Sequence, residues 1–263
     1  MFEREVTFED FKSKFEFEPK LAYLMGIEDE VFLVDARTDK LSTKSFMALD
    51  YLNDFNLYSY EPSECQLEYR VGPCELFDLG VGMKYERSRL ASKLRVLGLK
   101  MSHMQIAPAD MPLNLYPDPT GRYDVFETME PEKALSAMRI IATQFHVGMP
   151  DFKTALYIYN AFVGKEFNHL LNLAEEMSPG RLEIYGKVHE VCQPPVFPSL
   201  EHMFNYYQKK GWERNPKDNW MLIRMTVHGT IEFRMFGAME NLKDVERIAY
   251  YLMQRVDLIK MKM

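Results

Sequence analysis

The stretch Met25-Gly26-Ile27-Glu28-Asp29-Glu30-Val31-Phe32-Leu33-Val34-Asp35 decides how this chain folds. β-Branched and aromatic residues cluster after a glycine, which is typical of a β-strand whose side chains alternate between two faces. Glu28 and Glu30 then share one face, and both faces become apolar toward the end, which predicts a strand covered on both sides. The stretch by itself favours glutamates that point into water, because charged side chains are mostly exposed. Two carboxylates held close in a covered region would instead need a positive charge between them.

The composition is that of a globular protein. The chain has 263 residues, of which 47% are hydrophobic and 27% charged, enough to bury a sizeable core. It contains no internal repeat, linker or low-complexity segment, so we expect a single domain over residues 1–263. The net charge of −7 argues against a nucleic-acid partner.

Membrane and secretory signals are not expected. No apolar run approaches the length of about 18 residues that a membrane-spanning helix needs, and the acidic N-terminus lacks the apolar segment of a signal peptide. Three cysteines, Cys65, Cys74 and Cys192, have no CxxC spacing and fit free thiols in a reducing compartment. We therefore expect a cytoplasmic protein with no membrane partner. Its expected partners are small molecules, and both a monomer and a homo-oligomer stay open.

Hydrophobic periodicity predicts the remaining elements. We expect further strands at 65–71, 101–107, 143–148, 220–227 and 230–236. We expect helices at 75–99, 131–140, 151–177, 199–210 and 241–258, with an irregular loop over 178–199.

Five of the six expected strands have an apolar face opposite a polar one. The polar positions are Glu28, Glu30, Gln66, Glu68, Arg70, Gln144, His146, Arg224, Glu232 and Arg234. Antiparallel sheets often expose one face to water, so a plain α+β domain with a solvated sheet face stays open as an alternative. If the strands form one curved sheet, this face is a pocket. Carboxylates bind Mg²⁺ and guanidinium groups bind phosphates, so the pocket would suit nucleotide-dependent phosphoryl transfer.

Four motifs resemble those of a known family. They are GIEDE at 26–30, EPSECQLE at 61–68, FHVGMPD at 145–151 and GTIEFR at 229–234. Their order and approximate spacing resemble the glutamate–cysteine ligase type 2 (carboxylate–amine ligase) family. The resemblance extends from about residue 25 to the C-terminal helix, and it includes the loop PPVF at 194–197.

The resemblance implies an α+β fold of the glutamine-synthetase-like type. Its curved, mainly antiparallel sheet would hold ATP and Mg²⁺ (or Mn²⁺) on the concave face, with helices packed on the outer face. The activity implied is ATP-dependent ligation of a carboxylate, with glutamate as the expected acyl substrate, to an amine through an acyl phosphate. The implied metal ligands are Glu28, Glu30, Glu61, Glu68, Glu232 and His146, the last as a ligand or a phosphate contact. Arg234 and Arg224 would hold the transferred phosphoryl group, and we expect Gln144, Arg70 and Arg181 to contact nucleotide or substrate.

The chain departs from the family pattern at three places. Gln144 stands where the family usually has the first residue of His-x-His, Leu222 replaces a usual acidic residue, and the middle of the chain is short. These changes are compatible with an altered amine substrate or with lost activity. The alternative is therefore a non-catalytic homologue that binds nucleotide or amino acid or acts in regulation.

The other histidines are not spaced from a second metal ligand or catalytic residue in a way that would indicate a site. They are His103, His169, His189, His202 and His228, and we expect them to be surface or structural residues. Cys65 is adjacent to the strand that carries Glu68, and we do not expect it to be a nucleophile.

Overall fold

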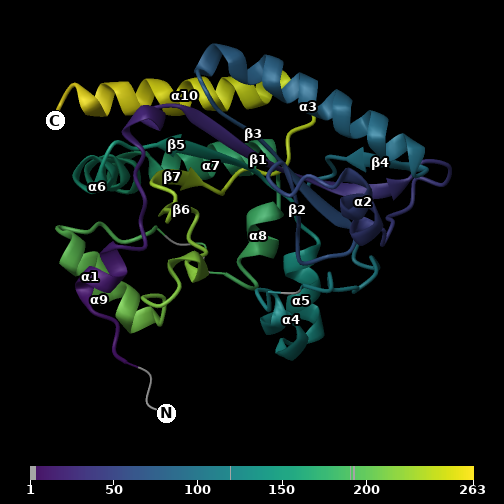
Figure 1. Cartoon of the computed structure of the whole chain (residues 1–263), viewed down its shortest axis with the longest axis horizontal. Coiled ribbons are helices and arrows are strands. Elements are labelled where there is room, and N and C mark those ends of the chain that lie inside the picture. The colour runs from purple at the N-terminus through teal and green to yellow at the C-terminus, as the bar shows by residue number, and fades with distance from the viewer. Residues whose placement is uncertain (1–3, 119, 190, 192) are drawn as a thin grey trace.

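The computed structural model describes residues 4–118, 120–189, 191 and 193–263, so Cys192 and residues 1–3 lie outside the part discussed below. The centre of the described part is a seven-stranded antiparallel sheet in the order β2-β3-β1-β5-β7-β6, with β4 paired to β1 (Figure 1). Helices cover this sheet, so the expected α+β fold with a mainly antiparallel sheet is confirmed.

The sheet is built from strands of unequal length. They are β1 (Met25–Asp35), β2 (Tyr58–Tyr60), β3 (Gln66–Cys74), β4 (Leu99–Ser102), β5 (Thr143–Gly148), β6 (Ile223–Met225) and β7 (Thr230–Phe233). The strand β1 is the longest and pairs with β3, β4 and β5. It is therefore the central strand of the sheet, and the other strands pair with β3 or β5 or follow from them.

The helical elements are short, except for the long helices at 76–96 and 242–260. The α-helices are α1 (Phe8–Lys12), α2 (Ser45–Leu52), α3 (Leu76–Val96), α4 (Asp124–Thr128), α5 (Pro131–Met138), α6 (Phe152–Ala161), α7 (Phe167–Met177), α8 (Arg181–Tyr185), α9 (Leu200–Lys210) and α10 (Leu242–Lys260). Single turns of 3₁₀-helix lie at Pro19–Leu21 and Pro216–Asp218, and a π-helical segment at Phe162–Glu166 joins α6 to α7.

The long helices α3 and α10 pack against each other over one face of the sheet, and α4, α5 and α8 lie on the other side (Figure 1). Apolar side chains of the strands, among them Ile27, Phe145 and Phe233, are fully buried in the main core. Asp29 points into this covered layer and is 0% exposed. Its carboxylate accepts hydrogen bonds from Tyr69, Thr143 and Arg87 at 2.5, 2.6 and 2.9 Å. Phe32 and Val34, on the other face of β1, are 0% and 4% exposed, so the expected covering of both faces toward the end of β1 is confirmed.

Several expected boundaries were wrong. The strand expected at 101–107 runs from Leu99 to Ser102, because only these residues reach the end of β1. The helix expected at 151–177 is interrupted by the π-helical segment, and the loop expected at 178–199 contains α8. The strand expected at 220–227 begins at Ile223, so Leu222 lies in the main core and not among the residues that line the polar face.

The helices of the described part include none that is both long enough and apolar enough to cross a membrane.

Candidate active site

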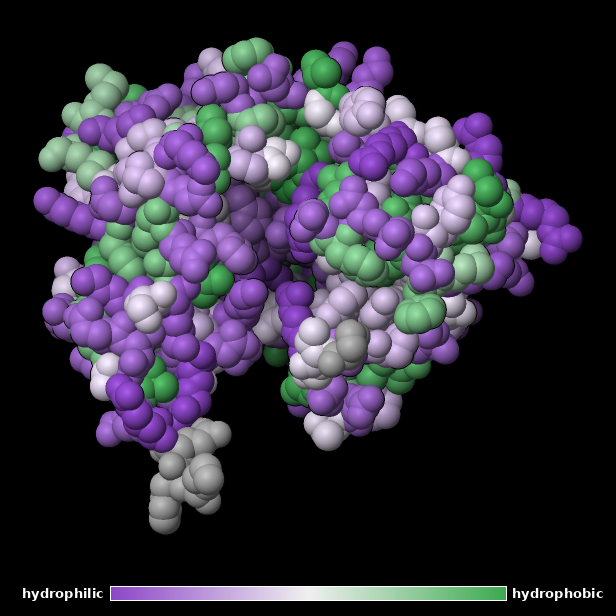
Figure 2. All heavy atoms as spheres, viewed as in Figure 1, coloured by the Kyte–Doolittle hydropathy of each residue, from purple (hydrophilic) through white to green (hydrophobic). Residues whose placement is uncertain are grey.

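A cavity of about 180 Å³ lies on the sheet face opposite α3 and α10. In the space-filling view the molecule is hollowed near its centre, and hydrophilic side chains line the hollow (Figure 2). Every residue that the sequence predicted for the site lines this cavity: Glu28, Glu30, Glu61, Glu68, Arg70, Gln144, His146, Arg181, Arg224, Glu232 and Arg234. The structure thus brings together side chains from five strands and from three positions outside them, namely Glu61 after β2, Arg181 in α8 and Arg234 after β7.

Strand pairing explains why these side chains meet. In an antiparallel sheet, residues directly opposite each other on neighbouring strands place their side chains on the same face. The opposed pairs are Glu30 with Glu68, Glu28 with both Arg70 and Gln144, His146 with Glu232, and Glu232 with Arg224. The alternation along each strand and the register between strands therefore build the polar surface.

The acidic groups form two clusters, each with three candidate metal ligands. Glu28, His146 and Glu232 form the histidine cluster, and Glu30, Glu61 and Glu68 form the three-glutamate cluster; within each, the ligand atoms lie within 4.8 Å of one another. The two clusters are the only groups of this kind that we find among the described residues.

Positive side chains already compensate the histidine cluster. Burial would raise the pKa of Glu28, but His146 and Arg70 lower it to about 2. Burial would likewise raise the pKa of Glu232, yet Arg224 and Arg234 hold it well below its usual value. Both carboxylates are therefore ionised at neutral pH.

Positive side chains compensate the three-glutamate cluster less fully, although Arg70 pairs with Glu68. Burial and the neighbouring Glu68 raise the pKa of Glu30 to about 7. Burial also raises the pKa of Glu61, with Glu30 as a further cause, and that of Glu68, with Glu28 as a further cause. Carboxylates that lie close together and raise one another's pKa values form a site where the binding of a divalent cation is favourable. The donor set of carboxylate oxygens, with one imidazole in the other cluster, suits Mg²⁺ or Mn²⁺.

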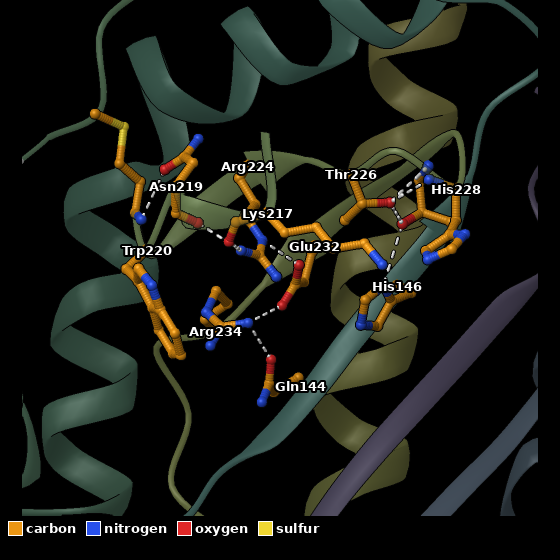
Figure 3. A network of polar contacts seen from close by, with 12 residues as sticks. Gln144, His146, Lys217, Asn219, Trp220, Arg224, Thr226, His228, Glu232 and Arg234 are labelled. Carbon is orange, nitrogen blue, oxygen red and sulfur yellow. Dashed lines mark hydrogen bonds and ion pairs between the residues drawn. The ribbon is translucent and has the colours of Figure 1, made fainter. Parts of the chain in front are cut away.

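Arg224 and Arg234 have different surroundings. Arg224 lies in β6, whereas Arg234 follows β7, which ends at Phe233 and not at residue 236 as expected. Arg224 donates from Nε to Glu232 at 2.5 Å and from one terminal nitrogen to the carbonyl oxygens of Lys217 and Asn219 at 3.1 and 2.5 Å (Figure 3). This side chain holds the segment before β6 against the cavity. Few of its donors are left for a ligand.

Arg234 points into the cavity and is 7% exposed. One terminal nitrogen donates to Glu232 and to the amide oxygen of Gln144, the latter at 2.6 Å, while Nε has no hydrogen-bond partner among the described residues. The guanidinium lies over the ring of Trp220, 5.0 Å from its centroid (Figure 3). Arg234 therefore keeps donors that can meet an anion.

The three residues expected to contact nucleotide or substrate are all held by partners. Arg70 pairs with Glu68 at 2.8 Å and with Glu28 at 3.5 Å. Arg181 donates to the carbonyl oxygens of Ile141 and Met235 at 2.9 and 3.2 Å, at the start of the helix α8 that the sequence did not predict. Gln144 lies between Glu30 and Arg234.

The structure adds site residues that the sequence argument missed. Arg122 lines the cavity from a loop organised by Asp118, whose carboxylate accepts from the hydroxyl of Tyr60 at 2.6 Å and from the backbone of Tyr123 at 3.1 Å. The loop has no periodicity, so the only sequence signal was the arginine itself.

An aromatic pair also lines the cavity. His189 stacks on Trp220 with ring centroids 4.6 Å apart and an angle of 5° between the rings. Burial, with a contribution from Arg234, lowers the pKa of His189 to about 4, so the ring is neutral at pH 7. This histidine was expected to be a surface or structural residue, and its place beside Arg234 could not be read from spacing.

Of the remaining candidates, His228 also lines the cavity, whereas His103 and Cys65 lie away from it. His103 lies 3.3 Å from the carboxylate of Asp29 in the covered layer, which is the structural position expected for it. Cys65 is fully buried in a small apolar cluster, and burial raises the pKa of its thiol to about 11. A thiol with so high a pKa is a poor nucleophile, in agreement with the sequence argument.

Fold and site together define a class: an antiparallel sheet with an acidic, arginine-lined pocket on its open face. A solved structure with a similar fold is a bifunctional glutathione synthetase from Pasteurella multocida, which matches with a TM-score of 0.56 and 15% sequence identity. The match covers 90% of this chain and 40% of that protein. At this identity the likeness shows a shared fold. No protein-family model and no curated protein matches the sequence.

Proposed function

We propose that the protein is an ATP-dependent carboxylate–amine ligase that joins the carboxylate of an amino acid, glutamate in the first instance, to an amine. The observation that carries this proposal is the pair of acidic clusters in one cavity together with Arg234. The fold shared with a glutathione synthetase supports the proposal. The chain spans 40% of that protein, so its activity comes to this chain only as a proposal.

The reaction balances without a nucleophile from the protein. An oxygen of the substrate carboxylate attacks the γ-phosphorus of ATP, ADP leaves, and an acyl phosphate forms. The amine nitrogen then attacks the acyl carbon, phosphate leaves with the bridging oxygen, and the nitrogen loses a proton. Catalysis of this kind rests on positioning and on charge stabilisation. The inertness of Cys65 is consistent with such a route.

The acidic clusters would hold divalent cations in this reaction. Glu28, His146 and Glu232 would bind one ion, and the three-glutamate cluster would bind another. When bound, such ions neutralise phosphate oxygens and stabilise the charge that develops during transfer.

The chain's own cations would act on the anionic parts of the substrates. Arg234 lines the cavity next to Glu232, where its guanidinium is placed to stabilise the charge of the transferred phosphoryl group. The side chain of Arg122 makes no ion pair among the described residues and lies beside Glu61 and Glu68, so it would suit the carboxylate substrate. Guanidinium groups bind carboxylate and phosphate in bidentate fashion, which fixes orientation as well as charge. Arg224 would act indirectly, because it holds Glu232 and the 217–219 segment.

The test is ADP release by the purified protein in the presence of Mg²⁺, ATP, glutamate and a panel of amines that includes cysteine. The proposal predicts ADP release that requires both the carboxylate and one of the amines. Nucleotide binding without amine-dependent ADP release would favour the alternative, a non-catalytic or regulatory homologue. The engaged Gln144 and the buried Leu222 are the features that favour that alternative.

A further inference from the structure

The strongest unassigned feature is the position of Gln144 between the two acidic clusters. Its side chain is buried, with 3% of the residue exposed. The amide nitrogen donates to Glu30 of the three-glutamate cluster, and the amide oxygen accepts from Arg234 at 2.6 Å. Arg234 in turn donates to Glu232 of the histidine cluster (Figure 3). A continuous chain of hydrogen bonds therefore runs from one cluster to the other.

The chemistry of the neighbours fixes the orientation of this amide. A carboxylate can only accept and a guanidinium can only donate, so the amide nitrogen must face Glu30 and the amide oxygen must face Arg234. The reverse orientation would place two acceptors together at one end and two donors together at the other. The amide oxygen is the atom of the Gln144 side chain that could bind a metal ion. This oxygen instead accepts a hydrogen bond from Arg234.

The space between the clusters is already occupied by a positive charge. The guanidinium of Arg234 lies over Trp220 and is shared between Glu232 and Gln144. An ion bound at Gln144 would have to displace this guanidinium. A fixed guanidinium needs no exchange with solvent and keeps its charge at every physiological pH.

We propose that Gln144 is a positioning residue that couples the two clusters through Arg234. This inference rests on the proposed function, because it assumes that each cluster binds a cation. It goes beyond that function by giving Gln144 a role other than metal ligation or substrate contact.

The test measures Mn²⁺ binding in the absence of nucleotide, by titration followed by electron paramagnetic resonance. The wild-type protein is expected to bind two ions, of which one shows nitrogen coupling from His146. Gln144→Met keeps the shape of the side chain but removes both hydrogen bonds. It is expected to weaken both sites by about 10–100-fold, the usual effect of removing a group that orients metal ligands.

Gln105→Met is the matched control. Gln105 is a half-buried glutamine that does not line the cavity, and its amide donates only to the backbone carbonyl oxygens of Met177 and Ala238, at 3.3 and 3.1 Å. This variant is expected to lower stability as Gln144→Met does while leaving both Mn²⁺ affinities unchanged. A general loosening of the fold would instead affect the affinities in both variants.

A second comparison tests the route through Arg234. In an Arg234→Met background, adding Gln144→Met should change the affinity of the histidine cluster by less than about twofold, since residues that act in series are not additive. An effect of Gln144→Met on one cluster alone or on neither would overturn the inference while leaving the proposed ligase intact. A protein that binds no Mn²⁺ at all would overturn both.

Discussion

Glu232→Gln is the substitution that separates a cation site from a structural ion-pair network most sharply. Glu232 is 0% exposed and accepts from Arg224 and Arg234, so its removal leaves the buried Arg234 and the largely buried Arg224 without this negative partner. Breaking a buried ion pair in this way costs about 3–5 kcal/mol. For a chain of this size, each kcal/mol corresponds to a fall in melting temperature of about 2–4 °C, so a fall of roughly 6–20 °C is expected.

The same substitution removes one of the three candidate ligands of the histidine cluster. We expect the Mn²⁺ affinity of that cluster to fall at least about tenfold, which corresponds to about 1.4 kcal/mol. The assay is thermal unfolding with and without Mn²⁺, because an ion present at about 100 times its dissociation constant stabilises the folded state by about 2.7 kcal/mol. The metal-induced rise in melting temperature should therefore shrink in the variant.

Glu166→Gln is the matched control for this experiment. Glu166 is also a buried glutamate, 8% exposed, and it pairs with Arg255 and Tyr251 far from the cavity. It should lower the melting temperature less, because Arg255 is partly exposed, and should leave the Mn²⁺-induced rise intact. If Glu232→Gln kept the full Mn²⁺-induced stabilisation, the histidine cluster would be a structural network and the reasoning would be refuted.

Three further outcomes are expected. Arg122→Gln should raise the KM for the carboxylate substrate by about 10–100-fold with little change in kcat, because a charge-assisted hydrogen bond contributes about 1.5–3 kcal/mol. An unchanged KM in steady-state kinetics would show that Arg122 does not bind this substrate. Burial and Glu68 raise the pKa of Glu30 to about 7, so this group stabilises the metal-free protein fully at pH values below the ordinary glutamate pKa and loses that contribution as pH rises through about 7. Mn²⁺ should consequently stabilise the protein more at pH 8 than at pH 6 in thermal unfolding, and an equal effect at both values would contradict this assignment. Cys65→Ala should keep kcat within about twofold and cost about 1–2 kcal/mol in denaturant unfolding, whereas loss of activity in a folded variant would reinstate a thiol nucleophile.

Much of the sheet could be predicted from the sequence because its information is local. The alternation in β1, β3, β5 and β7 assigns each polar residue to a face, and burial of the apolar face then fixes the register. Glu28, Glu30, Glu68, His146 and Glu232 accordingly lie where the alternation placed them. The grouping into two clusters needed the register between strands, which the sequence does not state.

The residues that were missed lie on irregular segments. Arg122 owes its position to the contacts of Asp118 with Tyr60, a residue 58 positions away along the chain. His189 and Trp220 lie on separate irregular segments, and their rings stack beside the cavity. Such positions depend on tertiary contacts and leave no periodic signal.

Leu222 shows the limit of alternation itself. The pattern placed Leu222 on the same face as Arg224, but the strand β6 begins only at Ile223. The backbone before it is not extended as part of the strand, and Leu222 turns into the main core. A strand end that shifts by a few residues is enough to move a side chain from a site to the core.

The measurement that tests the central claim most directly is isotope transfer from the substrate carboxylate. Glutamate labelled with ¹⁸O in its carboxylates is incubated with the protein, ATP, Mg²⁺ and the amine that supports ADP release, and the inorganic phosphate is analysed by mass spectrometry. A ligase that proceeds through an acyl phosphate predicts one ¹⁸O atom in each phosphate released. Unlabelled phosphate accompanying ADP would mean that water, and not the carboxylate, attacks ATP, and would contradict the account.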